Sequence, residues 1–200
     1  MHQLLLSRRG ASALLAALLT SASLMMLPLS TQAQTPAPKV RVTTSMGEFV
    51  LELNPSKAPK TVENFLQYVN DKHYDGTVFH RVISNFMIQG GGFTPDLQQK
   101  PTKAPIPLEA NNGLKNDRGA VAMARTNNPN SATTQFFINT VDNANLNAPL
   151  PDGHGYAVFG KVVSGMEVID KIRAVAVGDQ GMHQNVPKTP ITILKATLEK

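Results

Sequence analysis

Hydrophobic and polar residues alternate along two neighbouring segments, Val40–Thr44 and Glu48–Leu53. A repeat of two residues is typical of strands that bury one face. Only the short sequence SMG at 45–47 separates the two segments, and glycine is common in such tight turns. The pattern therefore predicts a β-hairpin, whose second strand ends before Pro55.

Two other segments, Ala58–Tyr74 and Met166–Val175, repeat their apolar residues every three or four positions. That period places the apolar side chains on one face of a helix. Asp75-Gly76 follows the first segment and predicts a turn that ends it. The apolar positions are Val62, Phe65, Leu66 and Val69 in the first helix and Val168, Ile169 and Ile172 in the second.

Six further apolar runs have the length of strands, and loops separate them, the longest of which is the irregular stretch Thr94–Asn116. Many short strands with two helices predict a mainly β chain. A closed antiparallel barrel with helices over its open ends suits this pattern, because closure leaves no exposed strand edge. The six runs are Thr77–Ile83, Phe86–Gln89, Gly119–Ala124, Gln135–Thr140, Ala157–Val163 and Ile191–Leu198.

The first 33 residues have the pattern of an export signal peptide. Arg8 and Arg9 precede an uncharged apolar stretch, Ala11–Leu29, and Thr31-Gln32-Ala33 resembles a cleavage site. We expect cleavage after Ala33, export to the periplasm, and no stable membrane insertion afterwards. Residues 34–39 (QTPAPK) then form a flexible lead-in to a single domain at 40–200.

Two alternatives to this interpretation stay open. The apolar stretch is just long enough to remain in the membrane as an uncleaved anchor, although polar residues and a proline interrupt it. Arg8 and Arg9 also resemble a twin-arginine signal, but the bulky apolar residue that usually follows is missing, so we expect the general secretory route. The interrupting residues are Ser12, Thr20, Ser21, Ser23 and Pro28.

Composition narrows the chemistry that the chain can perform. With 200 residues, of which 42% are hydrophobic, the chain can build one domain with a sizeable core. It has no Cys, which excludes disulfides, thiolate nucleophiles and a lipoprotein anchor. The histidines lack the spacing of metal ligands, so we expect no metal and no other cofactor.

The net charge of +5 does not indicate a nucleic-acid partner. Arg8 and Arg9 carry two of these five charges in the expected leader, which leaves the mature chain close to +3. The remaining Lys and Arg residues are scattered among Asp and Glu, without a basic run. We expect no nucleic-acid binding and, since no apolar helix or strand is left over, a monomer.

The segment that is most informative about chemistry is Tyr74–Gly91, with the sequence YDGTVFHRVISNFMIQGG. In a regular strand Phe79 and Arg81 share one face and His80 lies on the other, so we interpret His80 as a structural residue. Together with the sequences ART at 124–126 and QFF at 135–137, this segment predicts a shallow pocket. Its walls would be Phe and Met side chains with a few polar groups beside them.

The chain resembles the cyclophilin family, and within it the bacterial periplasmic branch. The resemblance runs from about Val40 to Leu198, and its longest motif is FHRVI-x-NFMIQGG. The motifs MART, SATTQFFI and YAVFGKV-x-x-GM support it further along the chain. The resemblance implies a closed eight-stranded antiparallel β-barrel capped by two α-helices, and the activity of a peptidyl-prolyl cis/trans isomerase.

The resemblance also implies which residues form the site. Arg81 falls at the catalytic arginine of the family. The other positions bind the substrate, as walls of the proline pocket, as polar groups, or where the substrate backbone pairs with the protein. They are Phe86, Met87, Gln89, Ala124, Arg125, Gln135, Phe137, Leu146 and Tyr156.

Three positions depart from the pattern of many relatives. Asn145 stands where an aromatic residue, often Trp, precedes Leu146, and Tyr156 stands where His is frequent outside the exported bacterial members. Arg125 stands where many relatives have Asn. We expect turnover to survive the changes at Asn145 and Tyr156, and cyclosporin to bind weakly, because many relatives use the Trp position to bind it.

The implied reaction suits an arginine. Resonance gives the peptide C–N bond a rotation barrier of about 18–20 kcal/mol, and X–Pro bonds exchange isomers only over tens to hundreds of seconds. When the bond twists, resonance is lost and the prolyl nitrogen becomes a better acceptor. The guanidinium of Arg81 stays protonated and can donate to that nitrogen, so it favours the transition state over the ground state.

The expected partners are proline-containing segments of unfolded or partly folded exported proteins. One alternative is a binding module or chaperone that grips such segments without turnover. A second alternative is a lipocalin-like barrel that carries a small molecule in a deep apolar interior. The loop Asn143–Gly155 includes Leu146 and therefore borders the predicted site. We hypothesise that this loop tunes which residue before proline the site prefers.

Overall fold

A computed structural model describes residues 36–199 of the chain. The predicted signal peptide at 1–33 and its cleavage site lie outside the described residues. Within 36–199, no helix is both long enough and apolar enough to cross a membrane.

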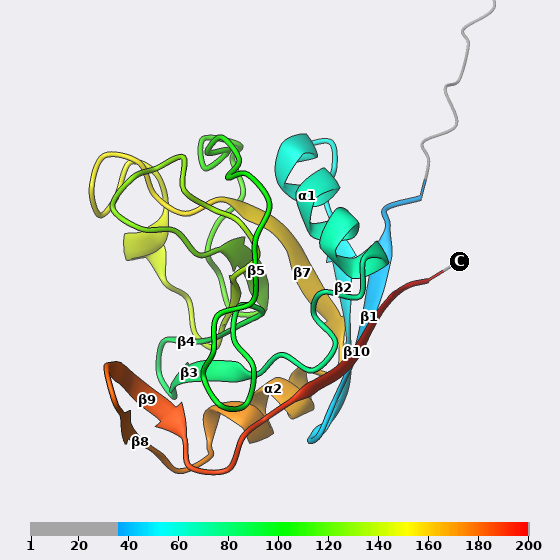
Figure 1. The fold of residues 1–200 in the computed structure, drawn as a ribbon. Helices are drawn as coiled ribbons and strands as arrows, with labels where there is room; N and C mark the ends of the chain where they lie inside the picture. The colour runs from blue at the N-terminus through cyan, green and yellow to red at the C-terminus, as the bar shows by residue number, and fades with distance from the viewer. Residues whose placement is uncertain (1–35, 200) are drawn as a thin grey trace, which may run out of the picture. The chain divides into compact units, whose positions relative to one another are not determined.

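The described region is built around one antiparallel sheet of eight strands (Figure 1). The strands follow the order β10-β1-β2-β7-β5-β6-β4-β3, so the first and last parts of the chain pair with each other. Every strand run predicted from the sequence overlaps one of these strands. Their bounds are β1 Lys39–Thr44, β2 Gly47–Leu53, β3 Phe79–Ile83, β4 Met87–Gly90, β5 Ala120–Met123, β6 Phe136–Asn139, β7 Val158–Ser164 and β10 Ile193–Leu198.

The sheet curls so far that its two edge strands meet. Just before β3 and β10 the chain forms an isolated antiparallel bridge between Val78 and Thr192. The backbone N–H of Phe79 donates to the carbonyl of Ile191 at 3.0 Å, and that of Ile193 donates to Thr77 at 2.7 Å. The predicted fold class, a mainly β barrel of eight antiparallel strands with two helices, is confirmed.

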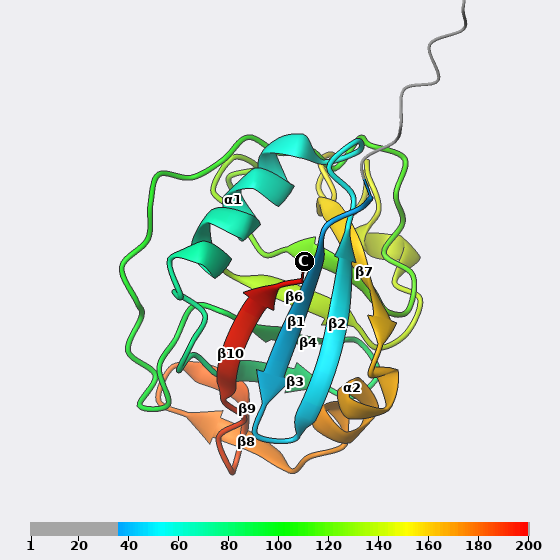
Figure 2. The ribbon, with the colours of Figure 1, turned by 90° about the vertical axis from the view of Figure 1, so that its right-hand side faces the viewer.

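The two helices cover opposite open ends of the curled sheet (Figure 2). They are α1, Pro59–Asn70, and α2, Met166–Arg173. Most of the predicted apolar positions are buried, while Leu66 packs against the core from a partly exposed position. The predicted first helix is too long, because Tyr74 leaves the helix to place its buried ring 5.0 Å from that of Phe65.

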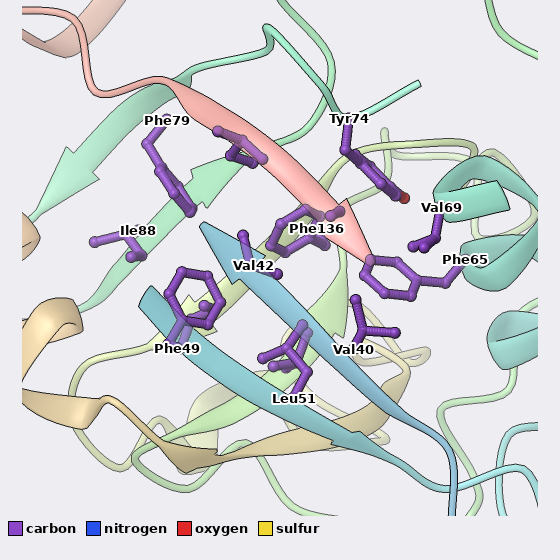
Figure 3. Close-up of a cluster of buried hydrophobic side chains, with 14 of the residues drawn as sticks. Val40, Val42, Phe49, Leu51, Phe65, Val69, Tyr74, Phe79, Ile88 and Phe136 are labelled. Atoms are coloured by element: carbon purple, nitrogen blue, oxygen red, sulfur yellow. The ribbon is translucent and has the colours of Figure 1, made fainter. Parts of the chain in front are cut away.

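The interior of the sheet is filled by aromatic and branched side chains (Figure 3). The ring of Phe136 stands edge-on to Phe65 and to Tyr74, with both centroid distances at 5.6 Å. Such edge-to-face pairs are a favoured aromatic geometry. Phe136 therefore links β6 to α1 and to the segment that follows it.

The structure contains a second, two-stranded sheet that the sequence did not predict. It consists of β8, Val177–Gln180, and β9, His183–Pro187. Its residues are mostly polar and partly exposed, with an irregular register, so the period-two signal of a half-buried strand is absent. The hairpin packs beside β3 and thereby reaches the candidate site.

Candidate active site

A break in strand pairing sets the direction of Arg81. Along β3 and β4, Phe79 pairs with Gly90 and Arg81 pairs with Gln89, so one extra residue, His80, is accommodated by a shift in register. A bulge of this kind inverts the alternation of side chains beyond it. The prediction that Phe79 and Arg81 share one face is therefore wrong: Phe79 belongs to the interior cluster, whereas Arg81 borders a surface pocket.

The side chain of His80, the bulged residue, also points in a different direction from the one that a regular strand predicts. His80 is 5% exposed, and its ring packs 4.6 Å from that of Phe93. It borders the same cavity as Arg81 instead of facing away from it. The expectation of opposite faces fails for the same reason, because the bulge breaks the period of two.

We expect the free energy of unfolding to decrease as the pH falls from about 6.5 to about 4. Burial, followed by the charges of His183 and Arg81, lowers the pKa of His80 from 6.5 to about 4. The unfolded chain binds a proton at His80 below about pH 6.5 that the folded chain binds only near pH 4. The resulting loss reaches up to about 3 kcal/mol.

Urea unfolding at pH 7, 5.5 and 4.5 measures this dependence. His80→Gln should flatten it, although not completely, because burial also lowers the pKa of His73. A His80→Gln variant with the full slope of the wild type would contradict the assignment.

A small pocket with apolar walls and a few polar groups lies on the outer face of β4, β5 and β6. Met87, Phe137 and Leu146 are its buried members, in a cluster separate from the interior core. The cavity measures about 110 Å³, well below the roughly 300–1,000 Å³ of drug-sized ligand sites. Its lining comprises nine of the ten residues predicted for the site: Arg81, Phe86, Met87, Gln89, Ala124, Arg125, Phe137, Leu146 and Tyr156.

Strand alternation explains why these side chains meet. On β4, Met87 and Gln89 point outward while Ile88 is buried in the interior cluster. On β6, Phe137 points into the pocket while its neighbour Phe136 fills the interior. The pairing of Gln89 with Phe137 aligns the outer faces of the two strands.

Gln135, the tenth predicted residue, lies beside the pocket and supports it. Its side-chain oxygen accepts a hydrogen bond of 2.9 Å from Nε2 of Gln89. That bond orients the amide of Gln89, whose Oε1 lies 3.4 Å from Nη1 of Arg81, a long contact. Among residues 36–199, Arg81 forms no ion pair with a carboxylate, so most of its donors remain free for a ligand.

Leu146 and Tyr156 close one side of the pocket. The backbone N–H of Tyr156 donates to the carbonyl of Leu146 at 2.9 Å, and the Tyr156 ring stands edge-on to Phe137 at 5.7 Å. Leu146 ends a short 3₁₀ helix, Ala144–Leu146, on which Asn145 is exposed. The position that is aromatic in many relatives therefore carries a small, solvated side chain here.

Ala124 and Arg125 both line the pocket, and each forms a different kind of contact with the rest of the protein. The backbone N–H of Ala124 is taken by the carbonyl of Gln135 at 2.9 Å. The side chain of Arg125 is only 2% exposed and pairs with Asp152. It serves as a wall of the pocket, held by protein contacts that the sequence did not reveal.

A second cavity, of about 340 Å³, lies on the other side of Arg81. Sequence reasoning missed it because the β8–β9 hairpin, which has no strand pattern, supplies three of its residues. No local signal links that hairpin to Arg81. The lining residues are His80, Arg81, Phe93, Gln135, Met182, His183 and Gln184.

Comparisons with known proteins agree on one family. The profile described as "Cyclophilin type peptidyl-prolyl cis-trans isomerase/CLD" matches residues 39–198. The chain is 62% identical to the peptidyl-prolyl cis-trans isomerase cyp18 of Streptomyces antibioticus, over 80% of this chain and 97% of that protein. It is 55% identical to peptidyl-prolyl cis-trans isomerase B of Escherichia coli, over 78% and 97% of the two chains.

Solved structures support the same assignment. A crystal structure of a cyclophilin-type peptidyl-prolyl cis-trans isomerase from Cryptosporidium parvum matches with a TM-score of 0.71 and 30% identity. The match covers 82% of this chain and 98% of that one. A second crystal structure of the same parasite protein, determined in the presence of the dipeptide Ala-Pro, matches with a TM-score of 0.70. By profile, sequence and fold, the chain belongs to the cyclophilin-type peptidyl-prolyl cis-trans isomerases.

Proposed function

We propose that this isomerase accelerates X–Pro bond rotation in exported proteins while they fold, with the proline ring in the pocket of about 110 Å³ and Arg81 beside the rotating bond. The observation that carries the proposal is the position of Arg81. Its guanidinium borders a small pocket with apolar walls and, within the described residues, forms no ion pair with a carboxylate. A guanidinium that is neutralised by a carboxylate would be a poorer donor to a substrate.

The pocket suits one end of the rotating bond. Met87, Phe137 and Leu146 offer apolar contacts, which favour burial of a proline ring over exposure to water. Holding the ring still while the preceding carbonyl turns positions the bond close to its twisted geometry. Positioning of this kind lowers a barrier because the entropy of orientation is lost on binding, before the chemical step.

Arg81 suits the other requirement, which is stabilisation of the twisted amide. Loss of resonance localises a lone pair on the prolyl nitrogen, and an N–H donor bound to that lone pair acts mainly in the transition state. The bond is charge-assisted and therefore stronger than a neutral one. Gln89, oriented through Gln135, lies where it can hold the guanidinium and the substrate backbone.

Two further facts support the proposal. The related Cryptosporidium parvum enzyme was crystallised in the presence of Ala-Pro, a dipeptide with the X–Pro bond in question. The leader of the present chain has the charge and apolar pattern of an export signal, which favours action on proteins in the periplasm. The expected mature chain begins at Gln34.

We expect the mature chain, Gln34–Lys200, to raise the cis-to-trans rate of a short Ala-Pro peptide far above the spontaneous rate. It should also accelerate the slow phase of a protein whose refolding is limited by proline isomerisation. A chain that binds such a peptide without accelerating it would support the binding-module alternative and contradict catalysis. A chain that prevents aggregation without accelerating the slow refolding phase would equally favour a chaperone.

Fractionation of cells that express the full chain tests the proposed location. We expect the protein in the periplasmic fraction with Gln34 as its first residue. Full-length protein in the membrane fraction would indicate an uncleaved anchor, and full-length protein in the cytoplasm would contradict export.

A further inference from the structure

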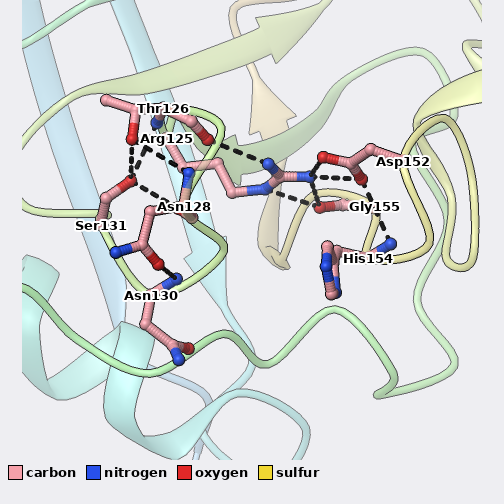
Figure 4. A network of polar contacts seen from close by, with 8 residues as sticks. All are labelled: Arg125, Thr126, Asn128, Asn130, Ser131, Asp152, His154 and Gly155. Carbon is pink, nitrogen blue, oxygen red and sulfur yellow. Dashed lines mark hydrogen bonds and ion pairs between the residues drawn. The ribbon is translucent and has the colours of Figure 1, made fainter.

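The side chain of Arg125 connects the end of β5 to a loop that follows the 3₁₀ helix (Figure 4). Its Nη2 lies 2.8 Å from both carboxylate oxygens of Asp152, and its Nε and Nη2 donate to the carbonyl of Gly155 at 3.0 and 2.9 Å. Its Nη1 donates to the carbonyl of Thr126 at 3.0 Å. All three nitrogens of this guanidinium are therefore occupied by the protein.

The buried guanidinium of Arg125 is stable only while its hydrogen-bond partners stay in place. A charge that is 2% exposed is unfavourable unless its partners satisfy it, and removing one partner leaves the charge uncompensated. Asp152 is 38% exposed, so water can reach the carboxylate but not the guanidinium. The loop therefore has one favourable position, in which Asp152 and Gly155 both reach Arg125.

Asp152 is itself held in place at this point. Its Oδ1 accepts the backbone N–H of His154 at 3.2 Å, and the hydrogen bond from Arg125 lowers its pKa below the ordinary value of an aspartate. Gly155 has a positive φ of 72°, and a Cβ there would lie 2.4 Å from the backbone nitrogen of Ala148. Only glycine fits this close approach of the loop to itself.

The same guanidinium also contacts a wall of the proline pocket. Its carbon lies 4.5 Å from the centroid of the Tyr156 ring, a distance at which a cation attracts an aromatic face. Tyr156 in turn stands edge-on to Phe137 inside the pocket. A continuous series of contacts thus runs from Asp152 through Arg125 and Tyr156 to the pocket.

We propose that Arg125 is a positioning residue, and that its pair with Asp152 fixes the 147–156 loop and the Tyr156 ring in the place that a substrate needs. The proposal rests on the proposed function, because it assigns a role in binding at that same site. It implies that the pair acts on substrate affinity and on the preference for the residue before proline. The pair does not take part in bond rotation itself.

The chain offers a control for this pair in a more exposed arginine, Arg118, whose partner Asp170 also accepts a hydrogen bond of 2.9 Å from Nε of Arg173. Arg118 contacts both carboxylate oxygens of Asp170 at 2.9 and 2.7 Å, and its Nη1 donates to the carbonyl of Thr140 at 2.6 Å. Asp170 has the same side-chain exposure as Asp152, 38%, but neither member of this second pair lines the pocket. The two carboxylates can therefore be neutralised in parallel, one beside the site and one away from it.

The experiment compares Asp152→Asn, Asp152→Glu and Asp170→Asn in the mature protein, with a series of X-Pro peptides that differ in X. For Asp152→Asn we expect KM to rise threefold to tenfold, by factors that differ across the series, while kcat changes by less than twofold. Asp152→Glu keeps the negative charge, so its KM should lie between those of Asp152→Asn and the wild type. Asp170→Asn should leave KM and kcat within twofold of the wild type.

Amide hydrogen exchange adds a readout that does not depend on activity. Exchange at Gly155 and Tyr156 should become faster in Asp152→Asn and stay unchanged in Asp170→Asn. If KM and exchange are unchanged in Asp152→Asn, or change equally in both Asn variants, the positioning role is wrong. A wild type without isomerase activity would overturn the proposed function instead, while the exchange comparison would still decide whether the pair holds the loop.

Discussion

We expect the replacement of Arg81 by Ala to lower kcat/KM for a short Ala-Pro peptide by tenfold or more in a protein that stays folded. A tenfold loss corresponds to about 1.4 kcal/mol of transition-state stabilisation. One charge-assisted hydrogen bond to the prolyl nitrogen is sufficient to supply this amount. The loss should appear mainly in kcat, because the proposed bond strengthens as the amide twists.

The fold should survive this change because Arg81 supports little else. Its one side-chain hydrogen bond among the described residues is the long one to Gln89, and its side chain is partly exposed. Arg81→Lys keeps the charge but loses the planar set of donors, so it should recover only part of the rate. Circular dichroism and urea unfolding check that both variants are folded.

Arg41→Ala is the matched control for loss of a positive charge. Arg41 is exposed on β1 and pairs with Glu48 at 3.2 Å and Glu199 at 2.7 Å, away from the residues that line the pocket. Exposed pairs of this kind contribute at most about 1 kcal/mol to stability, and we expect kcat/KM to stay within twofold. A folded Arg81→Ala variant with wild-type kcat/KM would refute the role of this arginine.

The parts of the fold that sequence predicted are those with regular period and burial. The hairpin pairs β1 with β2 as predicted, and β1 alternates, although β2 buries Phe49, Val50 and Leu51 in succession. The apolar face of α1 is buried where the helical period placed it. Its end was misplaced because Tyr74 is apolar in pattern but packs in the core from outside the helix. The hydrophobic pattern of a sequence indicates that a residue is buried, but it does not indicate whether that residue lies in the helix or in the segment after it.

The site shows a similar limit. The family resemblance implied ten site residues, and the structure brings nine of them to one pocket. The direction of Arg81, however, depends on a bulge at His80 that periodicity cannot show. The partner of Arg125, Asp152, is far along the chain in a loop with no regular pattern. Contacts that tertiary folding creates between irregular segments leave no local signal.

Replacing Phe136 by Ala should reduce the free energy of unfolding by about 3–5 kcal/mol, the usual loss for a buried aromatic residue. The ring is 1% exposed and stands edge-on to Phe65, Tyr74 and Phe79, so truncation leaves a cavity between β6, α1 and β3. The free energy of unfolding of a native domain is about 5–15 kcal/mol in total. The midpoint of urea unfolding should therefore fall by roughly 2 M.

The neighbouring residue separates stability from activity. Phe137 points to the outer face of the same strand and lines the pocket, whereas Phe136 points to the interior. At low temperature, where it remains folded, Phe136→Ala should keep kcat/KM within about twofold. Phe137→Ala should lose at least fivefold under the same conditions, because the proline ring loses a wall of its pocket.

Leu194→Ala serves as the control for an apolar truncation without burial. Leu194 is 54% exposed on β10, and a surface change of this kind costs no more than about 0.5 kcal/mol. Urea unfolding and peptide isomerisation, measured on all three variants, test both faces of β6 together. If Phe136→Ala lost activity beyond its unfolded fraction while Phe137→Ala kept full activity, the pocket would have to lie on the other face of the strand. The alternation that places Phe137 beside Gln89 and Met87 predicts the opposite result, because one face of β6 cannot serve both the core and the substrate.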